Sequence, residues 1–272
     1  MTEQIIAQRL GIALRQVQGT VRLLRDGATI PFISRYRKEA TGSLDELQVG
    51  AVKEQLDKLT ELEARKQTVL STIGEQGKLT DELRKRIEAC WEAVELEDIY
   101  LPYKPKRRTR ATVARERGLE PLANSIMAQH SHDIARQAQR FVTADVPTPE
   151  EAIAGACDII AERVSEDERA RNSVRRTAAR EGAVHSRLVK GKEQEGVKYS
   201  DYFDAASPLR TVSSHRFLAM RRGMDEGVLK ISVEMDADRI TEGLCRQFVR
   251  HGSATREWME AAVADSFKRL IR

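Results

Sequence analysis

The sequence predicts an all-α, multi-helix protein with a minor β element near residues 228–235. Apolar residues recur at spacings of three and four over most of the chain, which is the period of an amphipathic helix. The composition agrees, because a chain that is 32% charged and 5% aromatic is typical of exposed helices rather than of a compact β-sandwich. The run from Leu229 to Met235 instead alternates apolar and polar residues, with the period of a strand.

The N-terminal segment 4–24 predicts two short helices around Gly11, a helix-turn-helix-like unit. Ala7, Gly11 and Val17 match the small, turn and anchor positions of the DNA-binding motif. All three are common residue types, so a structural helical hairpin with the same packing needs explains them as well, and we favour it. After this unit, Ser43 followed by Glu46 predicts a capping box that opens a long amphipathic helix running to about Gly74.

Capping patterns predict the later helices. Thr148, Pro149 and Glu151 combine an N-cap, a proline at the first helical position and a capping glutamate. Other helix starts are predicted at Thr80, Glu120, Asp133, Ser165, Ser214 and Thr255. The helix from Thr80 is expected to continue through Val94, and the one after Ser165 is rich in arginine. The last helix reaches residue 272 without a glycine, a proline or a polar tail, so we expect the chain to be cut from a longer protein.

Residues 190–198 are the best candidate for a domain boundary. Two glycines and alternating charges leave little in this segment to bury. The sequence therefore predicts a helical N-terminal domain at 1–197 and the start of a second region at 198–272.

The most informative local feature is a basic loop at residues 102–117. Five cations and two prolines lie between Pro102 and Arg110 with no acid among them, and as far as Arg117 only Glu116 opposes seven basic side chains. Proline disfavours helix in the residue before it, so these cations are expected on an extended or turn-like segment that could follow phosphates. A solvated charge run between two helices is the alternative.

The basic side chains of this loop are the predicted nucleic-acid contacts, together with a second, shorter cluster. They are Lys104, Lys106, Arg107, Arg108, Arg110, Arg115 and Arg117, with Arg35, Arg37 and Lys38 as additional basic contacts.

The sequence contains no recognisable metal, disulfide, nucleotide-binding or catalytic motif. Cys90, Cys157 and Cys245 are far apart and have no histidine at ligand spacing, which argues against structural zinc and against a disulfide framework. The chain has no phosphate-binding loop, no dinucleotide fingerprint and no catalytic constellation. We therefore expect no enzyme, no cofactor and no metal. The charged N-terminus and the lack of a long apolar run predict a cytoplasmic protein.

Three segments resemble a known family: IPFISRYRKEATGSLDE at 30–46, DIYLPYKPKRRTR at 98–110 and SHRFLAMRRG at 214–223. They are similar to the bacterial Tex family of transcription accessory proteins. The resemblance implies a helical N-terminal region followed by an RNase H-like domain, helix-hairpin-helix elements and a C-terminal OB-fold that binds RNA. This chain would be the helical region, with 198–272 leading into the RNase H-like domain. The family's main nucleic-acid-binding element would then lie outside it.

Two functional hypotheses follow. In the first, the chain is a non-catalytic module that binds RNA or DNA without sequence preference and supports transcription machinery and the downstream domains of the same chain. In the second, it is a helical scaffold that docks RNA polymerase or ribosomal partners, through its amphipathic helices and the arginine-rich helix at 166–181, with no direct nucleic-acid contact. Under either hypothesis Arg35, Tyr36 and Arg37 could instead clamp helices together.

Overall fold

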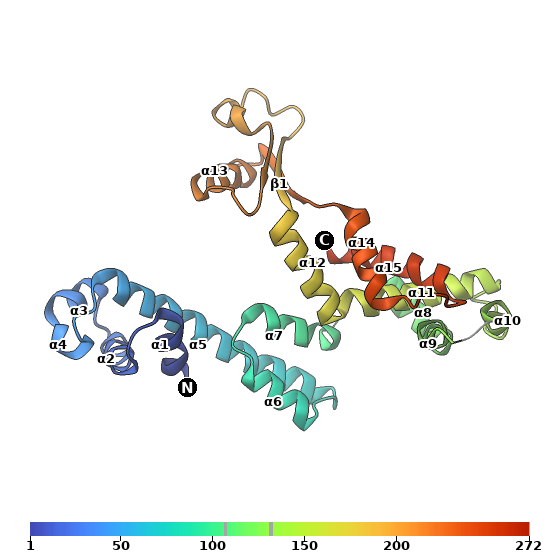
Figure 1. The fold of residues 1–272 in the computed structure, drawn as a ribbon, viewed down its shortest axis with the longest axis horizontal. Coiled ribbons are helices and arrows are strands. Elements are labelled where there is room, and N and C mark those ends of the chain that lie inside the picture. The colour runs from blue at the N-terminus through green and yellow to red at the C-terminus, as the bar shows by residue number, and fades with distance from the viewer. Residues whose placement is uncertain (106–107, 131–132, 272) are drawn as a thin grey trace. The chain divides into compact units, whose positions relative to one another are not determined.

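The computed structural model describes residues 1–105, 108–130 and 133–271, and it confirms a mainly helical chain (Figure 1). The chain forms two compact units, Met1–Lys104 and Pro105–Arg272. The division falls inside the basic loop. The segment 190–198 lies within the second unit, where it follows strand β1 (Ala183–Leu188) and runs into the start of the 3-10 helix η2 (Val197–Tyr202). No helix formed by the described residues is long and apolar enough to cross a membrane.

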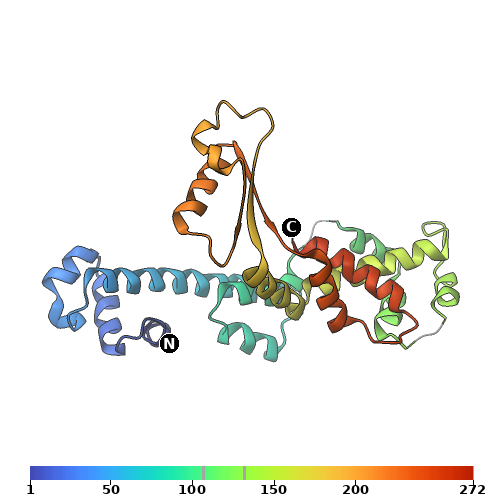
Figure 2. The same cartoon turned by 45° about the horizontal axis from the view of Figure 1, so that its top comes forward.

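The first unit is organised along one long helix, the predicted amphipathic helix (Figure 2). Its elements are α1 (Thr2–Leu10), α2 (Leu14–Arg25), α3 (Ile30–Tyr36), α4 (Lys38–Thr41), α5 (Glu46–Glu75), α6 (Asp81–Ala89), α7 (Ala93–Tyr100) and the 3-10 helix η1 (Leu101–Tyr103). Val52, Leu59 and Val69 of α5 are buried, and Ile6 and Ile33 from the shorter helices join them in one core. This burial drives the shorter helices onto α5.

The predicted helix pair around Gly11 is present, and packing explains the positions that suggested it. Gly11 has a positive φ of 64° at the end of α1, and Ala7 and Val17 are buried. One face of α2 packs on the next helices: Gln16 Nε2 donates to the carbonyl of Gly42, and Gly19 lies against Ala40. The structure thus shows a packed helical pair, and a DNA-reading role for α2 stays a prediction.

Two predicted caps are wrong, for backbone reasons. Ser43 has a φ of 65°, whereas an N-cap residue needs an extended backbone; Asp45 is extended and caps α5, accepting a hydrogen bond from Gln48 N at 2.8 Å. Ser165 lies inside a helix and donates back to the Glu162 carbonyl, so Asp167 caps the next helix instead. In both cases a neighbouring aspartate takes the capping position.

The helix predicted from Thr80 through Val94 is also wrong in length. Thr80 caps α6 as expected, but the helix ends at Ala89 and α7 begins at Ala93. The carbonyl of Glu88 accepts a hydrogen bond from the Nζ of Lys66 at 2.8 Å instead of continuing the helical ladder. A side chain of α5 therefore helps end α6.

The helices of the second unit pack around α11 and α15. They are α8 (Arg110–Glu116), α9 (Glu120–Ala128), α10 (Ile134–Gln139), α11 (Pro149–Glu166), α12 (Glu168–Glu181), α14 (Ala237–Phe248) and α15 (Arg256–Leu270). Thr148 caps α11 through its bond from Glu151 N, which confirms the prediction there. Ile159 and Ile160 of α11 are fully buried in a core shared with Val263 of α15.

The second unit also holds the β element, which is larger than predicted. β1, β2 (Asp204–Pro208) and β3 (Leu229–Glu234) form an antiparallel sheet in the order β2-β1-β3. The helix α13 (Ser214–Asp225) lies along the sheet in Figure 2, and its buried Met220 packs on Val184 and Ala205. β3 matches the predicted strand; the sequence analysis missed β1 and β2. β1 lies between the other two strands and provides the backbone hydrogen bonds that β3 would lack as a lone strand.

Candidate nucleic-acid interface

The basic loop 102–117 combines a turn and a helix. Residues Leu101–Tyr103 form η1, Lys104 is extended, and α8 begins at Arg110 behind its N-cap Thr109, whose Oγ1 accepts from Thr112 N. The predicted non-helical presentation is therefore confirmed for Lys104, while Arg110 and Arg115 are helical. Lys106 and Arg107 lie outside the described residues.

Arg115 forms an ion pair with a buried carboxylate. Its Nη1 lies 2.6 Å from the Oε2 of Glu162, a side chain of α11 that is 5% exposed. Thr109 Oγ1 donates to the other carboxylate oxygen of Glu162 at 3.0 Å. A buried carboxylate needs such partners, because an unpaired charge in the interior is costly. Arg115 therefore stabilises the packing of α8 on α11.

Arg110 belongs to an ionic network at the surface of the second unit. Its Nη2 lies 3.1 Å from Asp265 and 3.2 Å from Asp158, and Arg269 contacts the same two carboxylates. Burial acts to raise the pKa of Asp265, but the hydrogen bond from Arg269 and the charges of Arg269 and Arg110 hold it below its ordinary value. Asp265 is thus ionised at neutral pH, and it partly offsets the positive charge of Arg110.

The remaining cations of the loop are more accessible. Arg108 pairs with Glu116 at 2.9 Å, but its side chain is 71% exposed. Neither Lys104 nor Arg117 has an ion pair with a described residue, and both are exposed. Lys104 does act on Glu97 through its charge. The hydrogen bond from Arg65 is the main cause that lowers the pKa of Glu97, and the charge of Lys104 lowers this pKa further.

Three of these arginines share a groove in the second unit. Arg108, Arg110 and Arg117 line a surface depression of about 660 Å³, and its other lining residues include the apolar Val113, Ala114 and Leu119, the glycine Gly155 and the acids Glu151 and Asp158. A Cβ built on Gly155 would overlap Leu119, so this glycine allows α11 to approach the segment that follows α8. The structure thus brings three of the predicted contacts together around one groove. Arg115 does not line this groove and instead pairs with the buried Glu162.

The second cluster lies on α3 and α4 of the first unit. Arg35, Arg37 and Lys38 are exposed, and among the described residues Arg35 and Lys38 have no ion pair or side-chain hydrogen bond. Arg37 Nη1 donates only to the adjacent Tyr36 carbonyl, at 3.4 Å. A clamp would need side-chain hydrogen bonds from residues 35–37 to another helix, and the described residues show none. The alternative interpretation of residues 35–37 as a clamp between helices is therefore wrong.

Two aromatic residues of this cluster had no predicted binding role. Phe32 and Tyr36 are 40% and 65% exposed, and their ring centroids are 5.6 Å apart. The spacing of Phe32, Arg35 and Tyr36 (i, i+3, i+4) was the available signal, because such residues share one face of a helix. Their exposure could not be read from that spacing alone.

The arginine-rich helix α12 carries both exposed and half-exposed cations. Arg169, Arg176 and Arg180 are exposed, whereas Arg171 and Arg175 are half-exposed, and Arg175 donates to Asn172 Oδ1 at 3.1 Å. Arg180 pairs with Glu181, and a neighbouring helix supplies Arg239 to the same carboxylate. Helix α12 therefore keeps accessible guanidinium groups at its surface.

Comparisons with known proteins agree with the resemblance. Residues 1–74 match the family model for the Tex-like protein N-terminal domain, and residues 129–271 match the Tex central region-like model. The chain is 46% identical over 235 residues to the transcriptional accessory protein Tex of Neisseria gonorrhoeae, which covers 86% of this chain and 31% of that protein. It is 45% identical over 273 residues to the protein YhgF of Escherichia coli strain K12, covering 98% of this chain and 35% of that one.

A human relative is more distant. The S1 RNA-binding domain-containing protein 1 of Homo sapiens is 26% identical over 283 residues, which cover 98% of this chain and 28% of that protein. The chain spans about a third of the length of the curated relatives that it matches. Two Tex family models match this chain, and the Neisseria gonorrhoeae Tex protein is 46% identical over 86% of it. The chain therefore belongs to the Tex family of transcription accessory proteins.

Proposed function

We propose that this chain is a non-catalytic module of a Tex-type protein that contacts nucleic acid without sequence preference. The observation that carries the proposal is the groove lined by Arg108, Arg110 and Arg117. Three guanidinium groups from one short segment around one depression can follow a phosphate backbone, since each can donate two hydrogen bonds to a phosphate. Contacts to phosphates carry no sequence information, so binding is non-specific.

The acidic partners of these arginines do not prevent phosphate binding. The side chains of Arg108 and Arg110 are 71% and 68% exposed. The Arg108–Glu116 pair is exposed on both sides and is worth only about 0 to 1 kcal/mol, so a phosphate can replace that carboxylate at small cost. Asp158 and Asp265 keep Arg269 as a partner when Arg110 turns to a phosphate. Arg115 differs, because its partner Glu162 is buried, and we propose that it supports the fold and does not bind.

The relatives support the same class of function. One bears the name transcriptional accessory protein, and another is named for an RNA-binding domain. Since this chain matches about a third of each, its contribution is one of contact and support within a longer protein, beside transcription machinery and downstream domains.

Fluorescence anisotropy over a salt series tests the proposal. The chain is titrated onto single-stranded RNA, single-stranded DNA and duplex DNA, and compared with a variant carrying Arg108→Gln, Arg110→Gln and Arg117→Gln. The variant should bind more weakly, and the slope of log affinity against log salt should flatten by about two to three. A matched control removes three exposed, ion-paired arginines elsewhere in the second unit: Arg221→Gln, Arg239→Gln and Arg256→Gln.

The control separates a local site from a general loss of charge. Equal effects of the two triple variants would contradict a site at the groove, since each removes the same net charge. No binding by the intact chain to any of the three probes would overturn the proposal.

The scaffold hypothesis has one observation in its favour. Phe217 and Leu218 are 37% and 53% exposed on α13. Exposed apolar side chains side by side on one helix are a feature of protein-binding surfaces. Intact folding without any nucleic-acid binding would favour this function.

A further inference from the structure

The helix α3 presents aromatic rings to solvent. Ile33 is fully buried and Ser34 is buried, whereas Phe32, Arg35 and Tyr36 lie on the opposite face of the helix. Tyr36 is 65% exposed and Phe32 is 40% exposed, although side chains of this size normally contribute to a core. Ile33 and the partly buried Ile30 anchor α3 in the core of the first unit, and neither outward ring belongs to that core.

The exposed rings form a stack with a guanidinium group. The ring centroids of Phe32 and Tyr36 are 5.6 Å apart with an interplanar angle of 42°, and the Cζ of Arg37 lies 5.3 Å from the Phe32 centroid. Aromatic rings and arginine planes are the surfaces on which unpaired bases stack in proteins that bind single strands. Tyr36 is the more exposed of the two rings.

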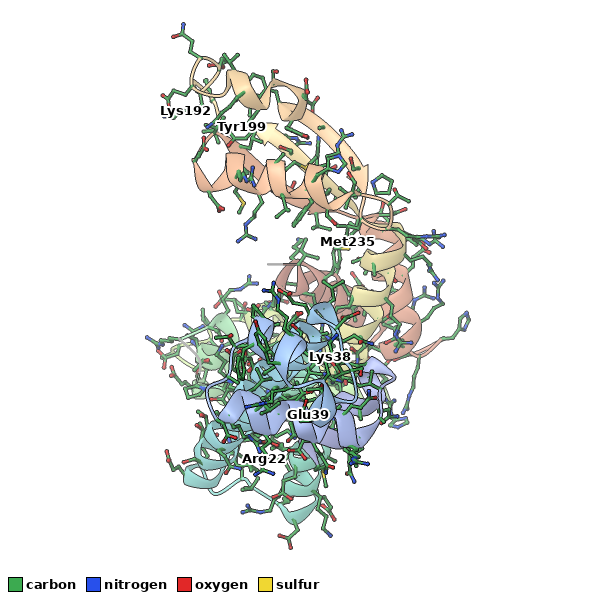
Figure 3. The ribbon with its side chains drawn as sticks, turned by 90° about the vertical axis from the view of Figure 1, so that its left-hand side faces the viewer. Arg22, Lys38, Glu39, Lys192, Tyr199 and Met235 are labelled. Atoms are coloured by element: carbon green, nitrogen blue, oxygen red, sulfur yellow. The ribbon has the colours of Figure 1, made fainter. Side chains whose placement is uncertain are left out.

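The side chains around the stack are mainly positively charged, and their cations are not neutralised by ion pairs with described residues. Arg35 and Lys38 have no ion pair or side-chain hydrogen bond within the described ranges. Glu39, which Figure 3 labels next to Lys38, is the one acid in the sequence from residue 27 to residue 44, against three basic residues. This excess of positive charge favours binding of a polyanion over binding of a protein surface that carries charges of both signs.

We propose that Phe32, Tyr36 and Arg37 form a base-stacking site for single-stranded nucleic acid, with Arg35 and Lys38 contacting the flanking phosphates. We call this set the α3–α4 platform. The proposal rests on the function proposed above and adds a preference: bases in a duplex have their faces covered by neighbouring pairs, so only unpaired bases can stack on the platform. The groove arginines, by contrast, read only phosphates.

The test uses a probe that has phosphates but no bases. The chain is titrated by anisotropy onto an oligouridylate and an oligothymidylate of about 12 nucleotides and onto an abasic deoxyribose oligomer of the same length. The intact chain should bind both base-containing strands about ten-fold or more tightly than the abasic strand. In the double variant Phe32→Leu, Tyr36→Leu this preference should fall to about one-fold.

Two controls keep the result specific. Tyr36→Phe retains the ring and should retain the preference for bases. Phe217→Leu removes a ring of matched exposure, 37% against 40%, from the other unit and should leave the preference unchanged. Circular dichroism melting shows whether the double variant is folded; if it is not, Tyr36→Leu alone, at the more exposed position, provides the comparison.

The outcomes separate this proposal from the previous one. If the intact chain binds all three strands with equal affinity, or if the leucine variants keep the full preference for bases, the platform is overturned while phosphate binding at the groove stands. If the leucine variants lose the preference but the groove variant binds normally, the platform is supported and the groove is not. Absence of binding to every strand overturns both.

Discussion

The imidazole Nδ1 of His185 lies 2.7 Å from the Oε1 of Glu234, and the two residues come from neighbouring strands, β1 and β3. On the other side of the ring, Nε2 lies 2.9 Å from Asp204 of β2. One side chain, 12% exposed, thus bridges all the strands of the sheet on the face opposite Met220. Its protonation state should therefore control how well the edges of this sheet are held.

This bridge predicts a pH-dependent sheet. The hydrogen bond to Glu234, and then that to Asp204, raise the pKa of His185 above its ordinary 6.5, and the bond from His185 lowers the pKa of Glu234 below 4.5. A raised histidine pKa stabilises the fold below about pH 6.5, and this contribution is lost as the pH rises through the folded value. The carboxylate contribution is present above pH 4.5 and is lost as the pH falls through its lowered value.

Titration by NMR checks this prediction. The His185 ring resonance should titrate above pH 6.5 in the intact chain and move back toward 6.5 in Glu234→Gln. Hydrogen exchange of β3 amides should be slowest between about pH 4.5 and 6.5 after correction for intrinsic exchange. An unshifted His185 midpoint in the intact chain would contradict the bridge.

The second prediction concerns the close approach of α2 and α4. A Cβ built on Gly19 would overlap the carbonyl oxygen of Ala40, which is backbone and cannot swing away. Gly19→Ala should therefore destabilise the first unit by about 2 kcal/mol or more, as overpacking does. Urea denaturation measures the change in free energy of unfolding.

Gly50→Ala is the matched control for this prediction. Gly50 also lies inside a helix, α5, but a Cβ there meets nothing within 4 Å. Removal of a helical glycine at an open site should stabilise by about 0.5 to 1 kcal/mol. The two substitutions should thus have opposite signs, and equal effects would show that the contact with Ala40 is unimportant.

The third prediction separates structural from accessible arginines. Arg115→Ala removes the cation that lies 2.6 Å from the Glu162 carboxylate, which is 5% exposed, and should cost about 2 to 3 kcal/mol of unfolding free energy. Arg108→Ala removes a surface pair and should cost less than about 1 kcal/mol. Thermal denaturation of both variants gives the comparison, and a stable Arg115→Ala protein would return Arg115 to the list of binding residues.

The fourth prediction concerns Lys66, a buried amine of α5. The side chain is 5% exposed, and its Nζ lies 3.8 Å from the ring centroid of Trp91. Burial lowers the pKa of Lys66 below its ordinary 10.5, so the unfolded chain holds more protons than the folded one as the pH rises toward that value. Stability conferred by this residue should therefore increase with rising pH in the alkaline range.

Comparison with Lys66→Met isolates the effect. The free energy of unfolding of the intact chain minus that of the variant should rise with pH, when both are measured by urea denaturation with tryptophan fluorescence. The variant loses the bond from Lys66 to the Glu88 carbonyl, which shifts its stability at every pH but does not alter the slope. Parallel pH profiles would show that Lys66 titrates normally.

Local signals in the sequence predicted most helices but not their ends. Thr80 and Thr148 were correct caps because a cap bonds to an amide three residues away. Ser43 failed because a left-handed backbone excluded it, and at the break after Ala89 the Glu88 carbonyl bonds to Lys66, 22 residues earlier in the chain. β1 and β2 were missed because their short, polar sequences show little alternation of their own.

The sequence by itself determined the helical class, the family and the set of basic residues, because periodicity, motifs and charge are written along the chain. Only the tertiary structure decided which cations are accessible. Arg115 meets a carboxylate 47 residues away and Arg110 one that is 155 residues away, so their roles depend on helix packing. Exposure of Phe32 and Tyr36 was decided in the same way, because burial is a property of what packs against a residue and not of the residue type.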